Sequence, residues 1–123
     1  MNPSTVREYL RLKLAGLEHE SFIAIWTDTQ HGVVAFEEVS RGSLWQAPVY
    51  PRELVKAGLR HNASAVFIAH NHPSGCARPS QEDKDLISTL ERALALVGIR
   101  VLDHFVIAGD TAYSFAEHGL MRG

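Results

Sequence analysis

Residues 64–98 read SAVFIAHNHPSGCARPSQEDKDLISTLERALALVG, and this segment predicts a strand, a loop and a helix in succession. The apolar run Ser64–His70 is typical of a strand that is buried on both faces. Two prolines and a glycine within Asn71–Pro79 predict a loop. Ser80 fits the N-cap of a helix that runs to about Val97 and stops at Gly98. A buried strand that leads into an amphipathic helix indicates an α/β fold.

The segments on either side extend this unit into one domain. They predict a helix capped by Ser4 within residues 1–16, strands over Ser21–Asp28 and Gly32–Arg41, a loop over Gly42–Tyr50, a helix from Pro51, and strands over Ile99–Gly109 and Thr111–Phe115. The two strands before the loop form one expected hairpin, and the last two strands form another. We therefore expect a single α/β domain over residues 1–123, in which helices flank a mixed β-sheet.

Length and charge narrow the classes of protein that fit this chain. The sequence has 123 residues and a formal net charge of −2, so no general basic excess favours nucleic acid as a partner. Its one cysteine, Cys76, excludes an internal disulfide and favours a cytoplasmic location. The N-terminus lacks the apolar core of a signal peptide, and no apolar run reaches the length of a membrane span.

The segment after the central strand carries a pattern typical of a metal site. His70 and His72 are two residues apart, so on an extended backbone both rings point to one side of the strand. Asp83 lies one turn before Leu86 and Ile87 of the apolar helical stripe, which places it on the inward face of the first turn. Two histidines and a carboxylate, with a fourth position for water, form the ligand set of many catalytic zinc sites.

A purely structural interpretation of these residues is open as well. Ser80 and Asp83 have the spacing of a capping box, in which the acidic side chain bonds back to the start of the helix. A single acidic residue in a first helical turn is more often a cap than a metal ligand. The residues by themselves leave the metal site and the capping box as alternatives.

Hydrolysis at such a site also needs a general base, and the second strand offers two candidates. Glu37 and Glu38 are adjacent, so they face opposite sides of the sheet. The alternation of polar and apolar residues along this strand does not choose between them. An exposed carboxylate without a catalytic role is the ordinary alternative for either residue.

The string HNHPSG at residues 70–75, followed by Ser80 and Asp83 in register, resembles the JAMM metalloprotease motif of the JAB/MPN family. The residues of this string are similar to those of the RadC branch in particular. The same is true of YPRE at 50–53, DH at 103–104 and YSF at 113–115. This resemblance covers nearly the whole chain from about residue 17, and it implies the cytidine deaminase-like JAB/MPN architecture. It also implies a short form that lacks the N-terminal helix-hairpin-helix region of longer RadC-like proteins.

The resemblance assigns roles to particular residues. It implies that His70, His72 and Asp83 bind Zn²⁺ and that Ser80 orients the water or steadies the oxyanion. The family pattern A-x-E-x-x-x-x-G fits Ala35 through Gly42, so it implies that Glu37 is the general acid/base.

The implied function is a zinc-dependent metalloprotease or isopeptidase that acts on a peptide or protein substrate. The alternative is a nucleic-acid-binding accessory protein associated with DNA repair, or a metal-dependent nuclease that uses the same site. The sequence does not predict the substrate or the oligomeric state.

Overall fold

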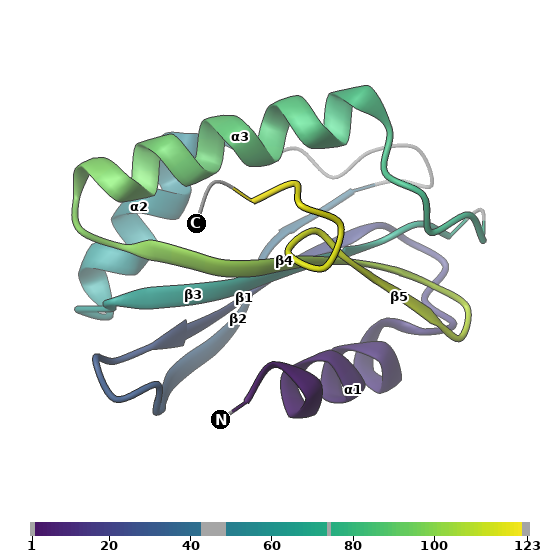
Figure 1. The fold of residues 1–123 in the computed structure, drawn as a ribbon, viewed down its shortest axis with the longest axis horizontal. Helices are drawn as coiled ribbons and strands as arrows, with labels where there is room; N and C mark the ends of the chain where they lie inside the picture. The colour runs from purple at the N-terminus through teal and green to yellow at the C-terminus, as the bar shows by residue number, and fades with distance from the viewer. Residues whose placement is uncertain (1, 43–48, 74, 122–123) are drawn as a thin grey trace.

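The structure is a computed structural model that describes residues 2–42, 49–73 and 75–121. Five strands form one sheet in the order β2-β1-β3-β4-β5 (Figure 1). The strands are β1 (Ser21–Thr27), β2 (Val33–Arg41), β3 (Ala65–Asn71), β4 (Arg100–Ala108) and β5 (Thr111–Ser114). β3 and β4 are parallel, and every other neighbouring pair is antiparallel. The predicted mixed sheet and both predicted hairpins are therefore confirmed.

Helices cover both faces of this sheet. The helices are α1 (Pro3–Leu14), α2 (Pro51–Arg60) and α3 (Gln81–Leu96). In Figure 1, α2 and α3 lie on one side of the sheet and α1 lies on the other. Residues 43–48 of the predicted loop before α2 lie outside the described part of the chain.

The central strands β1 and β3 are buried along their whole length, as their apolar sequences predict. Alternate residues of each strand enter two separate cores. Trp26 and Ile68 pack against α2 and α3, whereas Ile25 and Phe67 pack in the core that includes α1. This alternation matters for function, because it sends successive residues at the end of β3 to opposite sides of the sheet.

The start of α1 differs from the sequence prediction. Asn2, and not Ser4, is the N-cap, and its side-chain oxygen accepts a hydrogen bond from the backbone N–H of Thr5 at 2.9 Å. Ser4 lies inside the first turn. The reason is that Pro3 fits the first helical position, where its fixed φ suits the helix and its missing N–H costs nothing, so the cap falls on the residue before it.

The close approach of α2 to the sheet depends on Gly58. A Cβ atom added to Gly58 would lie 2.6 Å from Cδ1 of Ile99 and 2.9 Å from Cζ3 of Trp26, both fully buried side chains. We expect Gly58→Ala to lower the free energy of unfolding by about 1 kcal/mol, because overpacking of about 1–3 kcal/mol exceeds a helix-propensity gain of about 1 kcal/mol. Urea unfolding would measure the change, with the exposed Lys56→Ala as a control on the same helix. Unchanged or increased stability of Gly58→Ala would contradict this account of the packing.

Candidate functional site

The end of β3 and the start of α3 bring the two histidines and Asp83 together. The Nε2 atoms of His70 and His72 are 3.0 Å apart. Asp83 places Oδ1 at 3.5 Å from His70 Nε2 and Oδ2 at 3.2 Å from His72 Nε2. Three potential ligand atoms from two elements therefore converge on one point.

Asp83 also completes the capping box of α3. Its Oδ2 accepts a hydrogen bond from the backbone N–H of Ser80 at 2.8 Å, and its own N–H donates to Ser80 Oγ at 3.0 Å. Oδ1 takes no part in these capping bonds and faces His70. The capping box and the metal site, which were alternatives in the sequence, are thus compatible in a single carboxylate.

Neighbouring groups fix the orientation of both histidine rings. His72 Nδ1 lies 2.8 Å from the backbone carbonyl of Cys76, so this nitrogen carries the proton and donates it, which leaves Nε2 with a lone pair. His70 Nδ1 lies 2.7 Å from Nε2 of His104, a fully buried residue of β4. Partners of this kind on the far nitrogen are what orient the histidine ligands of metal sites.

Burial and mutual contacts shift the pKa values of these groups. Burial lowers the pKa of His70, and it lowers that of His104 to well below the usual value. For His72, the hydrogen bond to Asp83 raises the pKa despite partial burial. Burial alone would raise the pKa of Asp83, but hydrogen bonds from His70 and His72 outweigh it and hold that pKa far below the usual range. Asp83 is therefore ionised at neutral pH, as a metal ligand must be.

A further acidic residue lies at this site, and the sequence prediction missed it. Ligand atoms of Glu20, His70 and His72 all lie within 4.8 Å of one another. Burial raises the pKa of Glu20, and the charge of Asp83 adds to this effect, although His72 opposes it. Glu20 immediately precedes β1, whose Phe22 pairs with His70 across the antiparallel ladder. An acidic residue just before an apolar strand was the available signal, but it becomes informative only once β1 is known to pair with β3.

The two glutamates of β2 have other partners. Glu37 accepts a hydrogen bond from Trp26 Nε1 at 2.7 Å and lies 3.3 Å from His61 and 3.4 Å from Arg60. Trp26 belongs to the end of β1 that is remote from Glu20. Glu38 accepts a hydrogen bond from Ser21 Oγ and is paired with Arg41 and His19. None of the contacts of Glu37 is with the histidines at the end of β3.

Ser80 lies beside the cluster at the start of α3. Its Oγ accepts the capping bond from Asp83, and the residue as a whole is exposed. The hydroxyl hydrogen is not used by this bond, so the side chain retains one donor.

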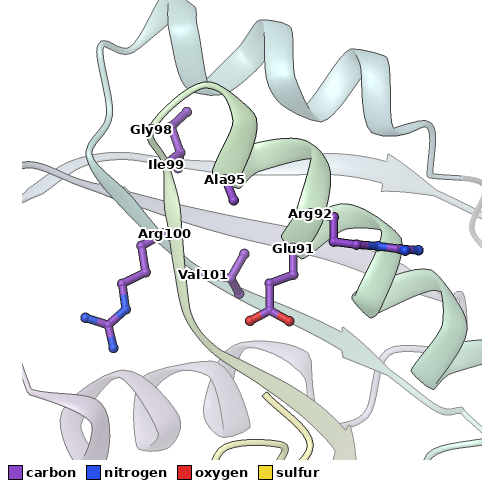
Figure 2. A pocket seen from close by; sticks show the side chains of 7 residues that line it. All are labelled: Glu91, Arg92, Ala95, Gly98, Ile99, Arg100 and Val101. Atoms are coloured by element: carbon purple, nitrogen blue, oxygen red, sulfur yellow. The ribbon is translucent and has the colours of Figure 1, made fainter. Parts of the chain in front are cut away.

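A separate cavity of about 470 Å³ lies near the other end of α3 (Figure 2). It is lined by Glu91, Arg92, Ala95, Gly98, Ile99, Arg100 and Val101. Figure 2 shows the two arginine side chains pointing away from each other, so they do not converge on one anion. None of the residues around the histidine cluster lines this cavity.

Comparison with known proteins agrees with the motif and the sheet. The family described as RadC-like JAB domain matches residues 1–120. The chain belongs to this family. The wider JAB domain family includes hydrolases, and the cluster at the end of β3 is a candidate metal centre.

Curated relatives of this RadC-like domain are about half identical to it over nearly its whole length. A UPF0758 protein of Nitrosomonas eutropha is 54% identical over 120 residues, which are 98% of this chain and 54% of the relative. A UPF0758 protein of Thiobacillus denitrificans is 56% identical over 118 residues, which are 96% of this chain and 53% of the relative. The chain thus spans about half the length of the curated relatives that it matches. Within the part of the RadC-like domain that the structure describes, no helix is long and apolar enough to cross a membrane.

Proposed function

We propose that this RadC-like domain is a zinc-dependent hydrolase that cleaves a peptide or isopeptide bond. The observation that carries the proposal is the convergence of His70 Nε2, His72 Nε2 and the Asp83 carboxylate at one point, with the Glu20 carboxylate beside them. Two imidazoles and one carboxylate leave a fourth tetrahedral position open, which is the arrangement of catalytic zinc sites.

The donor set fits zinc in chemistry as well as in number. Imidazole nitrogen is a ligand that zinc favours, and the bond from His72 Nδ1 to the Cys76 carbonyl keeps Nε2 available. Asp83 supplies a negative charge through Oδ1, the oxygen outside the capping box. When bound, zinc supplies a Lewis acid that polarises a carbonyl and lowers the pKa of water.

Glu20 is the residue that we assign as general base in place of Glu37. Its carboxylate lies at the cluster, and burial raises its pKa above the usual value, which makes it a stronger base. Glu20 takes a proton from the attacking water and passes it to the leaving amine. Ser80, with its free hydroxyl hydrogen, is placed to donate a hydrogen bond to the oxyanion.

The test is Glu20→Gln, which keeps the shape of the side chain but removes its basicity. We expect hydrolysis to fall by about 10²–10⁴-fold at saturating zinc, the usual contribution of a general base. The measurement is initial rate on a library of quenched fluorescent peptides, with a single-stranded DNA oligonucleotide assayed in parallel. Glu37→Gln is the matched control, because the same change there leaves the site intact.

The outcomes separate the two glutamates and the two substrate classes. If Glu20→Gln kept full activity and Glu37→Gln lost it, the general base would be Glu37 on β2 and not Glu20. Cleavage of DNA but of no peptide, dependent on His72, would replace the peptide substrate with a phosphodiester. Wild-type protein that takes up no zinc would end the hydrolase proposal.

A further inference from the structure

Asn71 stands between the two histidines in sequence but faces the other side of the sheet. β3 is extended up to Asn71, so its side chain alternates with those of His70 and His72. Asn71 is only 3% exposed, and a buried amide must find partners for both its oxygen and its nitrogen. It finds them in the backbone that surrounds Glu20.

Two hydrogen bonds from this one amide bracket Glu20. The backbone N–H of Ser21 donates to Asn71 Oδ1 at 2.7 Å, and Asn71 Nδ2 donates to the carbonyl of His19 at 2.9 Å. The partners are a backbone donor and a backbone acceptor, so the amide has only one orientation that satisfies both. In a parallel ladder, the N–H and C=O of one residue bracket the opposite residue in the same way. The Asn71 side chain therefore substitutes for a strand residue opposite Glu20.

This bracket lies where regular pairing between β1 and β3 has ended. The last paired residues of that ladder are Phe22 and His70, so the backbone of Glu20 lies beyond it. From the β2 side, the Glu20 carbonyl accepts a hydrogen bond from Gly42 N–H at 2.8 Å. On the β3 side, the side chain of Asn71 makes the corresponding connection to residues 19 and 21.

We propose that Asn71 is a positioning residue that holds the Glu20 carboxylate at the metal site by fixing the backbone on both sides of Glu20. The inference rests on the proposed function, because it concerns the residue assigned there as general base. The three residues 70–72, at the end of β3 and directly after it, thus supply the two imidazoles on one face and the bracket for the base on the other.

The test is a double-mutant cycle on zinc affinity, measured by competition with a chelating dye and zinc alone as the probe. Glu20→Gln is expected to weaken zinc binding by about tenfold, as loss of a supporting group near a metal does. Asn71→Leu removes both bonds at similar volume and is expected to weaken binding to a similar degree. In the Glu20→Gln background, Asn71→Leu is expected to add less than about twofold, because residues that act through one another are not additive.

Two further variants serve as controls for the role of Asn71. Asn71→Ala also removes both bonds, and it serves in the same cycle if the leucine variant does not fold. It adds no charge, so it introduces no new electrostatic interaction with residue 20 in either background. Ser21→Ala removes the hydroxyl that bonds Glu38 but leaves the Ser21 N–H in the bracket, so its zinc affinity is expected to equal that of wild type.

Three results would overturn the inference, and they are distinguishable from one another. Equal losses from Asn71→Leu in both backgrounds would mean that Asn71 acts through the histidines or the fold. Wild-type affinity in both Asn71 variants would mean that the bracket does not place Glu20. Absence of zinc binding in the wild type would remove the proposed function and this inference together.

Discussion

His72→Ala is expected to reduce bound zinc from about one ion per chain to none, because a three-ligand site that loses a ligand no longer closes around the ion. The Nε2 atom of His72 lies 3.0 Å from His70 Nε2 and 3.2 Å from Asp83 Oδ2. His72 is only partly buried, so its removal leaves the core packing in place. The measurement is metal content of protein purified without chelators or nickel resin.

His118→Ala is the matched control for this experiment. His118 stacks on Tyr113 at a ring distance of 4.0 Å, and its contacts are with β5 and not with the cluster. The His118→Ala variant loses one histidine, as His72→Ala does, but it is expected to retain zinc. If His72→Ala still held about one zinc ion per chain with unchanged affinity, the zinc site would lie away from His72.

Asp103→Ala is expected to lower the free energy of unfolding by about 3 kcal/mol or more. The Asp103 carboxylate is 5% exposed and accepts hydrogen bonds from the N–H groups of His104 and Ala116 and from the hydroxyl of Ser114. Each buried donor left without a partner costs about 1–3 kcal/mol. A loss of this size is a large part of the 5–15 kcal/mol, roughly, that stabilises a typical domain.

Urea unfolding would measure this loss. Asp110→Ala is the control, because the Asp110 side chain is fully exposed, and it is expected to change stability by no more than about 0.5 kcal/mol. Asp103→Asn is expected to fall between the two, since its carbonyl oxygen still accepts the backbone bonds. If Asp103→Ala were as stable as the Asp110 control, the network would have no stabilising role.

Most of the sheet could be predicted because its signals are local. The apolar run that becomes β1 and the turns of both hairpins lie within a few residues of the structure they specify. The predicted N-cap of α1, Ser4, was wrong because Pro3 occupies the first helical position and so places the cap on Asn2. The first helical position favours proline, and the pattern of apolar residues, from which the helix was predicted, gives no information about this preference.

The residues of the site likewise differ in how far they could be predicted from local sequence. His70, His72 and Asp83 belong to one strand–loop–helix unit, so their spacing in sequence predicted that the structure would bring them together. Glu20 is about 50 residues away and reaches the cluster only through the antiparallel pairing of β1 with β3. His104 likewise reaches His70 through the parallel pairing of β3 with β4. Contacts between strands distant in sequence leave no periodic trace in either segment, so the sequence did not predict Glu20 at the cluster.

The alternation at the end of β3 also determines which kinds of sequence change this segment can accept. A substitution at His70, Asn71 or His72 replaces a side chain on one face of the sheet only. Insertion or deletion of a single residue upstream in β3 would exchange the two faces, because side chains alternate with a period of two. The imidazoles would then turn toward α1, the amide would turn toward α3, and ligands and bracket would be lost in one event. A change in the number of residues in β3 is therefore expected to damage the site more than a substitution of any single residue in it.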